Sequence, residues 1–434
     1  MNKQEHIAHG EGLPRRSFLG LLLGSALSAC GGGGGTLVSG ISSGGTGSFT
    51  TGSIVGFGSI IVNGVRYDDA SAQVGDVDGD DHTGLGALKL GMVVAVQGSA
   101  TTTTNAGFNY TAEGTANQVV FLTELKGPIS AVDAANLTFD VLGQRVRWSS
   151  TTIFDGLATS ATNLAAGQEA EVYGLWNASA QEWQATRVET SMATPAFYRL
   201  TGEVSAIDAA SQTLTISGQV VSYAGLSFDS SIAVGSRVRT VLNPTPVAGA
   251  WVASAVRSAD WSAVPLVSWS PTDSEGHEAE LEGIVTGLVG TRFELQGFVV
   301  DGSALNTTLS NGQRVEVKGR FFNGVLVATG VEADGDDERE LRGFELHGVV
   351  SSTTPSTFVL RDFTVTYDSN SQGTAGLVDG AYVEAHIALQ ADGTWRAVEV
   401  EVKSTTSSGS VTETSSSNDH YGSDGETEDE NDGD

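Results

Sequence analysis

A short β-strand cassette recurs five times along the chain, and this recurrence restricts the fold more than any other feature of the sequence. Each copy opens on a glycine followed by an apolar run, reaches a segment close to Gly-x-x-Val-x-Val near its middle, and closes on Ala-x-x-Val. The opening glycines are Gly52, Gly127, Gly202, Gly283 and Gly348. Successive copies are therefore 75, 75, 81 and 65 residues apart, which indicates tandem small domains, because solenoid repeats are about 20 to 50 residues long.

Apolar and polar residues alternate inside each copy, as they do in strands with one buried face. In the fourth copy, Val315 and Val317 are predicted to point into a core while the charged residues beside them point to water. Asn63-Gly64 stands between two apolar runs and predicts a two-residue hairpin turn. Several such short strands in one copy fit a small barrel, because closure removes exposed strand edges. We therefore expect an all-β chain of about five tandem small barrels.

The copies and their connections define the predicted domains. These are a signal peptide at 1–29, a lipidated cysteine with a Gly/Ser tether at 30–50, repeat 1 at 51–121, repeat 2 at 122–190, repeat 3 at 199–258, a connector at 259–278, repeat 4 at 279–334, repeat 5 at 341–403 and an acidic tail at 404–434. The tail holds nine acidic residues and no Lys or Arg, a composition typical of disorder. A domain this small buries only about 60% of its unfolded surface, so we expect neighbouring repeats to pack together, at least partly.

The first thirty residues have the order of a secretory signal: basic residues, a short apolar run and small residues before a cleavage site. Arg15 and Arg16 with the residues that follow resemble a twin-arginine export signal. Pro14 and Gly20 depart from the fuller pattern, so export by the general secretory route remains an alternative.

The segment Leu27-Ser28-Ala29-Cys30 resembles a bacterial lipobox, whose cysteine is acylated and becomes the mature N-terminus. Cys30 is the only cysteine of the chain, and five glycines follow it. Each buried CH2 of an acyl chain contributes about 0.8 kcal/mol of membrane affinity. We therefore predict a protein that is lipid-anchored to the outer membrane through Cys30 and faces the periplasm or the cell surface.

Charge and cysteine content exclude several other functions. The net charge of -30 disfavours a nucleic-acid partner, because binding to phosphates depends on Lys and Arg. A single cysteine allows neither an intrachain disulfide nor a thiolate metal cage. The seven histidines are scattered and form no HExxH motif, so no metalloprotease signature is present.

The cassette resembles a known family, the domain of unknown function 5666 found in tandem in bacterial exported lipoproteins. The residues that carry the resemblance in the second copy are 127–132, 133–139, 167–174 and 185–189. The resemblance covers roughly residues 51 to 403 and consists of glycine and valine positions. It implies OB-like small barrels and an envelope location, and it supplies no catalytic residue that can be transferred.

One acidic loop is a candidate metal site. Asp76, Asp78 and Asp80 alternate along the chain and could supply oxygen ligands to a weakly bound Ca2+. The places that an EF-hand loop gives to Gly and Glu hold Asp81 and Ala87, so a solvated acidic loop is the favoured interpretation.

Three tryptophans near predicted hairpin tips could stack on a sugar ring or a partner protein: Trp176, Trp183 and Trp395. Aromatic residues of small barrels are more often core or cross-strand contacts. Paired carboxylates such as Glu169 and Glu171 look like those of a glycoside hydrolase, but they alternate on one strand, as a solvated face does.

We therefore expect a non-enzymatic envelope protein whose tandem barrels form a binding or structural module. The alternatives are a glycan- or Ca2+-binding module and, more remotely, an envelope hydrolase with a site between repeats. No cofactor is expected apart from Ca2+ in the second case. The expected partners are the membrane, through the lipid on Cys30, and an envelope protein or glycan.

Overall fold

The computed structural model describes residues 48–77, 83–99, 102–103, 112–121, 124–260, 276–333 and 343–404. Outside these ranges lie most of the connector, nearly all of the tail, most of the tether and the predicted signal and lipidation residues Arg15, Arg16, Leu27, Ser28, Ala29 and Cys30. The last three residues of the predicted tether, 48–50, are the start of a strand. The described residues form strands and two short 3-10 helices, η1 (Leu85–Ala87) and η2 (Ala161–Asn163). Neither of these described helices has the length and apolar character that crossing a membrane requires.

The strands of the first three repeats follow one another along the chain. Repeat 1 contains β1 (Ser48–Phe57), β2 (Ile60–Val62), β3 (Val65–Asp68), β4 (Gln73–Asp76), β5 (Val93–Gly98), β6 (Thr102–Thr103) and β7 (Ala112–Phe121). Repeat 2 contains β8 (Leu125–Asp133), β9 (Thr138–Val141), β10 (Gln144–Arg147), β11 (Ile153–Gly156), β12 (Glu169–Asn177) and β13 (Glu182–Ser191). Repeat 3 contains β14 (Tyr198–Asp208), β15 (Thr213–Ile216), β16 (Gln219–Ser222), β17 (Arg237–Leu242) and β18 (Trp251–Ser258).

The last two repeats follow a similar order, but repeat 4 has one more strand than repeat 5. Repeat 4 contains β19 (His277–Ile284), β20 (Thr286–Val289), β21 (Arg292–Leu295), β22 (Phe298–Asp301), β23 (Arg314–Phe322) and β24 (Val325–Ala333). Repeat 5 contains β25 (Phe344–Ser351), β26 (Thr357–Leu360), β27 (Phe363–Thr366), β28 (Tyr382–Leu389) and β29 (Trp395–Ser404).

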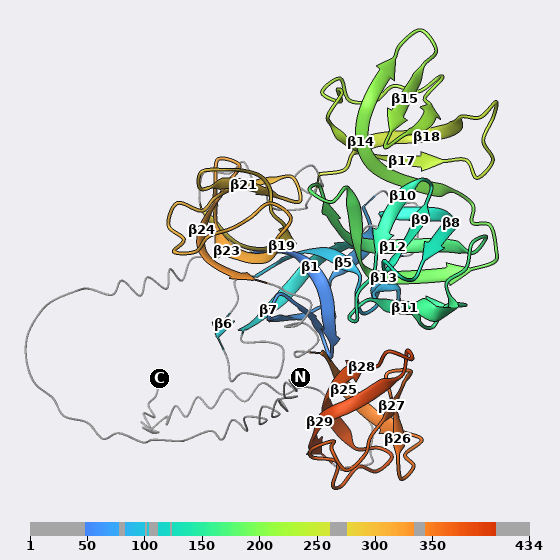
Figure 1. Ribbon diagram of the computed structural model, residues 1–434. Helices are drawn as coiled ribbons and strands as arrows, with labels where there is room; N and C mark the ends of the chain where they lie inside the picture. The colour runs from blue at the N-terminus through green and yellow to red at the C-terminus, as the bar shows by residue number, and fades with distance from the viewer. Residues whose placement is uncertain are drawn as a thin grey trace, which may run out of the picture. The chain divides into compact units, whose positions relative to one another are not determined.

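Each group closes into a small barrel with one strand order. In repeat 2, β8 pairs with β9, β9 with β10, and β10 runs parallel to β13. The ring then closes through β12, which pairs with both β13 and β8. Repeat 5 closes in the same order from β25 to β29 (Figure 1). A five-stranded barrel of this kind is OB-like, and the predicted all-β fold of small barrels is confirmed.

Two glycine positions of the cassette have clear structural causes. The five midpoint glycines, Gly91, Gly167, Gly235, Gly312 and Gly380, have φ between +80° and +91°, a region that favours glycine. The opening glycine lies under the next hairpin turn: a Cβ on Gly127 would be 2.8 Å from Leu142 Cγ. Leu142 has φ +49°, as the first turn residue of a type I′ hairpin requires. Glycine at the start of the cassette thus lets the hairpin fold onto the opening strand.

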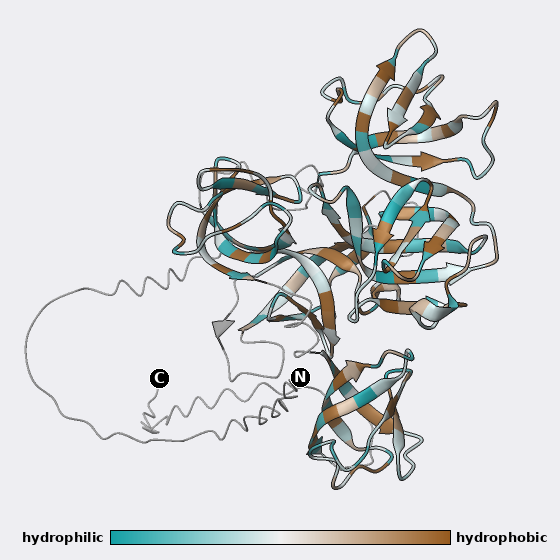
Figure 2. Ribbon diagram, viewed as in Figure 1, coloured by the Kyte–Doolittle hydropathy of each residue, from teal (hydrophilic) through white to brown (hydrophobic). Residues whose placement is uncertain are grey.

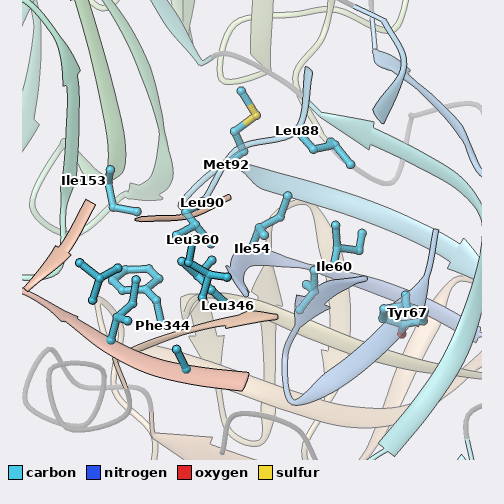
Figure 3. Close-up of a cluster of buried hydrophobic side chains, with 14 of the residues drawn as sticks. Ile54, Ile60, Tyr67, Leu88, Leu90, Met92, Ile153, Phe344, Leu346 and Leu360 are labelled. Atoms are coloured by element: carbon cyan, nitrogen blue, oxygen red, sulfur yellow. The ribbon is translucent and has the colours of Figure 1, made fainter. Parts of the chain in front are cut away.

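Apolar and polar residues alternate along many strands, as Figure 2 shows by colour, and every second residue of β23 is buried. Val315 and Val317 are buried, as the alternation predicts. The apolar cores, however, extend beyond single repeats. Ile54 of repeat 1, Ile153 of repeat 2 and Leu346 of repeat 5 belong to one buried cluster (Figure 3). Packing therefore joins repeats that are distant along the chain as well as neighbours.

The opening strands of different repeats also pair with one another. β1 runs parallel to β19, with Thr50 opposite Glu280, and parallel to β25, with Gly56 opposite Glu345. β8 is antiparallel to β14. Side chains alternate along a strand, so residues one and three before the opening glycine point away from their own core.

Those outward positions are buried where repeats meet, although the sequence pattern predicts a solvated face. Buried polar side chains at these positions are Thr51, Glu124, Lys126, Arg199, Thr201, Glu280, Glu282, Glu345 and His347. Buried charges must be paired or bound by a ligand to be stable. The contacts between repeats are therefore the places where polar chemistry is concentrated.

Candidate functional site

A cavity of about 430 Å³ lies where side chains of repeats 2, 3 and 4 meet. Its chemically active lining residues are Glu124, Trp176, Trp183, Glu203, Arg237, Asp260, Glu294 and Gln296. Small-molecule sites typically occupy about 300 to 1,000 Å³. The cavity therefore has room for a ligand of the size of a mono- or disaccharide.

Two of the three predicted tryptophans line this cavity. Trp176 on β12 and Trp183 on β13 are directly opposite each other in the antiparallel pair. Their ring centroids are 5.3 Å apart, with 56° between the ring planes. Trp183 is 1% exposed and belongs to the shared core of repeats 2 and 3, whereas Trp176 is partly buried beside it. The two tryptophans thus form a cross-strand contact and also line the cavity.

Arg237, at the start of β17, covers the tryptophan pair. Its guanidinium carbon lies 5.4 Å from the Trp183 ring centroid and 6.0 Å from that of Trp176. Such cation–π contacts contribute about 0.5 to 2 kcal/mol. They hold the guanidinium at the cavity.

Two buried polar atoms at the cavity have no hydrogen-bond partner within the described part of the chain: Glu124 Oε2 and Trp183 Nε1. Glu124 is only 3% exposed. Each unpaired buried polar atom costs about 1 to 3 kcal/mol. Both atoms have almost no solvent exposure, so a hydroxyl group, which both donates and accepts, reaches them only when the lining side chains move.

Burial changes the acid–base chemistry of the cavity. It raises the pKa of Glu124 to about 7, against the opposing effect of the charges on Arg237, Arg239 and Arg199. Burial likewise raises the pKa of Asp260 and lowers that of Arg237. A carboxyl group that retains its proton near neutral pH can donate a hydrogen bond as well as accept one.

The charges on the described lining residues restrict the ligand. Four carboxyl groups line the cavity, from Glu124, Glu203, Asp260 and Glu294, which disfavours an anionic ligand. Arg237 lies over the tryptophan rings and disfavours a cation there. Aromatic faces together with groups that donate and accept hydrogen bonds fit an uncharged ligand rich in hydroxyl groups.

The third predicted tryptophan is elsewhere. Trp395 begins β29, and its ring centroid lies 5.2 Å from that of Phe344 and 5.5 Å from that of Phe363, both with edge-on geometry. It packs against the core cluster of repeats 1 and 5. Trp395 therefore has the core contact that aromatic residues of small barrels usually have.

The predicted Ca2+ ligands are only partly described. Asp76 ends β4, and its carboxylate accepts hydrogen bonds from Arg199 at 3.2 Å and 3.4 Å, with both side chains fully buried. Asp78 and Asp80 lie outside the described residues. Asp76 thus takes part in a buried ion pair between repeats 1 and 3, and Ca2+ binding by this loop stays a prediction.

The paired carboxylates on β12 contact other residues of the chain. Glu169 accepts a hydrogen bond from the Tyr198 hydroxyl at 2.9 Å, and Glu171 lies 2.7 Å from Lys126 Nζ. The first contact joins repeats 2 and 3, and the second joins two adjacent strands of repeat 2. Each of the two carboxylates thus has a contact within the chain.

The sequence did not single out Glu124, Arg237 or Asp260. Each is a lone charged residue at a strand end, and strand alternation cannot distinguish a solvated charge from one covered by another repeat. One signal was present: Glu124 stands three residues before the opening glycine, at the position that other copies fill with Arg199 and Glu280. The residue at this position differs among repeats that are otherwise similar. Such variation is expected where each repeat contacts a different neighbouring repeat.

The fold and the cavity define a class: tandem OB-like barrels with a polar cavity between them. The family model described as "Domain of unknown function (DUF5666)" matches three segments, residues 126–189, 282–332 and 347–401. These segments lie in repeats 2, 4 and 5, so the predicted resemblance is borne out for those three repeats.

Other comparisons add little. No curated protein matches the chain significantly. One solved structure, described as "drosophila Unr CSD456", aligns with 65% of this chain and 98% of its own chain, at 10% sequence identity and a TM-score of 0.12. A TM-score this low supports no argument about shared fold or function.

Proposed function

We propose that the chain is a non-enzymatic binding protein of the bacterial cell envelope that holds an uncharged glycan unit in the cavity between repeats 2, 3 and 4. The observation that supports this most is the cavity of about 430 Å³, which the cross-strand pair Trp176 and Trp183 lines together with Arg237 and four carboxyl groups. Trp176 offers a partly exposed ring on which a sugar can stack, and Arg237 supplies additional donors. Stacking and hydrogen bonding then act on the same small ligand.

The proposed location follows from the first thirty residues. Cys30 would carry the lipid and the glycines after it would tether the barrels to the outer membrane. Labelling cells with a clickable palmitate analogue tests this, with Cys30→Ser as the matched variant. We expect the label on the wild-type chain alone, and equal labelling of both chains would contradict lipid attachment at Cys30.

Glycan binding is tested with the purified chain on an array of neutral and acidic oligosaccharides, followed by calorimetry with each glycan that binds. We expect neutral glycans to bind and Trp176→Ala to weaken binding by up to about tenfold, because aromatic contacts contribute about 0.5 to 1.5 kcal/mol. Glu124→Gln keeps the shape of the side chain but changes its hydrogen bonding, and it should weaken binding too.

Glu169→Gln is the matched control, because Glu169 bonds to Tyr198 and does not line the cavity. It should bind the same glycans with unchanged affinity. If no neutral glycan binds, or if Trp176→Ala and Glu124→Gln bind as the wild type does, the proposed ligand site is wrong.

A second candidate is hydrolysis of a bound glycan, and the pKa of about 7 for Glu124 favours it. A carboxyl group that is protonated near neutral pH can act as a general acid. Asp260 is a second carboxyl group at the same cavity. Release of reducing sugar that disappears in Glu124→Gln would support hydrolysis, and binding without turnover would leave the non-enzymatic role.

A further inference from the structure

Repeat 5 carries two Glu-x-His segments on adjacent strands. Glu345 and His347 lie on β25, and Glu384 and His386 lie on β28. The antiparallel register places Glu345 opposite His386 and His347 opposite Glu384. Residues two apart share a face and opposite residues are neighbours, so the four side chains form one array on the outer face of this barrel.

Three members of the array converge. Glu345, His347 and Glu384 are 0%, 5% and 4% exposed, and one ligand-type atom from each lies within 4.8 Å of the other two. His347 Nε2 is 2.5 Å from Glu345 Oε1, and His347 Nδ1 is 4.0 Å from Glu384 Oε2. Within the described residues no other group of three His, Cys, Asp or Glu side chains converges in this way.

Repeat 1 covers the array. The parallel pairing of β1 with β25 sets Gly56 opposite Glu345, and a Cβ on Gly58 would collide with the His347 side chain. Two glycines in one short segment thus let the β1 backbone lie directly on the array. The burial of these ligand-type residues is therefore built into the contact between repeats 1 and 5.

Repeat 4 has the same four positions but different chemistry. There the register pairs Glu280 with Lys318 and Glu282 with Glu316. Lys318 Nζ lies 2.8 Å from Glu280 and 3.4 Å from Glu316, and Arg314 pairs with Glu282. Repeat 4 thus meets its buried carboxylates with ammonium and guanidinium groups, which cannot coordinate a metal.

Repeat 5 has two imidazoles where repeat 4 has Glu282 and Lys318. Lys403 pairs with one carboxylate of the array, because its Nζ is 3.1 Å from Glu384 Oε2 and 2.8 Å from Glu401 Oε2. The Lys403 side chain is 40% exposed, so it stands between the buried carboxylate and solvent.

We propose that Glu345, His347 and Glu384 form a binding site for a divalent transition-metal ion, with Zn2+ the best match. Imidazole nitrogen with carboxylate oxygen is a ligand set of zinc, whereas all-oxygen sets suit Ca2+ and Mg2+. A divalent charge at this point offsets the two buried carboxylates. His386 lies opposite Glu345 on the adjacent strand. A metal there would strengthen the contact between repeats 1 and 5.

The test uses the full-length, tag-free chain after dialysis against a chelator, with Zn2+ titrated by calorimetry and Co2+ followed by its visible absorption. We expect one equivalent of Zn2+ to bind and to raise the melting temperature. His347→Gln and Glu384→Gln should each weaken binding by roughly tenfold or more and abolish the shift in melting temperature. The Co2+ absorption band should be lost or displaced in both variants.

His277→Gln is the matched control, since His277 lies on β19 of repeat 4 and outside the array; it should bind as the wild type does. The proposal is overturned if the wild-type chain takes up no Zn2+ or Co2+ up to millimolar concentration, or if Glu384→Gln binds with unchanged affinity. Should His347→Gln fail to fold, the near-isosteric Glu384→Gln decides the question alone.

Discussion

Two buried carboxyl groups near Arg199, those of Asp76 and Glu124, differ in how they are paired. Asp76 accepts two hydrogen bonds from the Arg199 guanidinium in a fully buried pair. Glu124 is influenced by the charges of Arg199, Arg237 and Arg239, yet one of its oxygens lacks a partner among the described residues and its pKa is raised to about 7. The carboxylate of Asp76 joins two repeats through an ion pair. The carboxyl group of Glu124 belongs to the lining of the candidate site.

The largest expected effect comes from breaking the complete pair. Arg199→Met leaves the Asp76 carboxylate buried without its guanidinium partner, and we expect a loss of about 3 to 5 kcal/mol in the free energy of unfolding. Urea unfolding monitored by tryptophan fluorescence measures it. The double change Asp76→Leu with Arg199→Met should recover most of the loss, because neither charge of this pair then remains. A single change that costs under about 1 kcal/mol would show that the pair is solvated.

The incomplete pairing of Glu124 predicts a pH dependence. Its pKa is raised from 4.5 to about 7, so the folded state holds the proton more tightly than the unfolded chain does. The contribution of this group to stability is greatest below pH 4.5 and falls by up to about 3 kcal/mol as the pH rises through 7.

The matched variant is Glu124→Gln, which cannot titrate. Its free energy of unfolding relative to the wild type should increase between about pH 5 and about pH 8.5, and unfolding curves at both pH values measure this. An identical difference at the two pH values would mean that Glu124 ionises as an exposed glutamate does.

A smaller effect is expected from the backbone that carries Glu124. A Cβ on Gly127 would lie 2.8 Å from Leu142 Cγ, and overpacking of this kind costs about 1 to 3 kcal/mol. Gly127→Ala should therefore lower the melting temperature. Gly330→Ala is the control, because a Cβ there meets only Lys318 Cβ, at 4.0 Å. Equal melting temperatures for the two variants would show that the hairpin does not press on Gly127.

The smallest effect belongs to an exposed pair. Arg320 and Glu278 form a salt bridge whose side chains are 40% and 51% exposed. Surface pairs contribute about 0 to 1 kcal/mol, so Arg320→Met should change the free energy of unfolding by less than about 1 kcal/mol. A larger loss, measured in the same urea experiment as Arg199→Met, would remove the distinction between buried and exposed pairs.

Local pattern was enough to predict the barrels. Strand alternation predicted that Val315 and Val317 are buried, and Asn63-Gly64 predicted a hairpin turn whose residues have φ of +48° and +68°. These features depend on neighbours in sequence. Trp176 and Trp183 were also found as candidates, because both stand near one hairpin tip.

Contacts between repeats could not be predicted in the same way. Asp76 and Arg199 are 123 residues apart, and the local sequence around either residue does not predict a contact with the other. Glu124 and His347 occupy outward positions that look solvated in a single barrel. Their chemistry appears only when a second barrel covers them, so the cavity and the Glu-x-His array depend on tertiary pairing that the pattern of one repeat does not encode.

The pairing of β1 with β19 and β25 has a consequence for how the chain assembles. Repeat 1 is synthesised before the residues that it contacts. Its Ser53, for example, donates a hydrogen bond to Glu282, which follows 229 residues later. Contacts so distant slow folding, and five similar opening strands offer wrong partners in the meantime. An incorrect match would bury like charges, for example Glu280 against Glu345. The polar side chains at these positions differ from repeat to repeat. They therefore disfavour incorrect pairing between the opening strands of the repeats during folding.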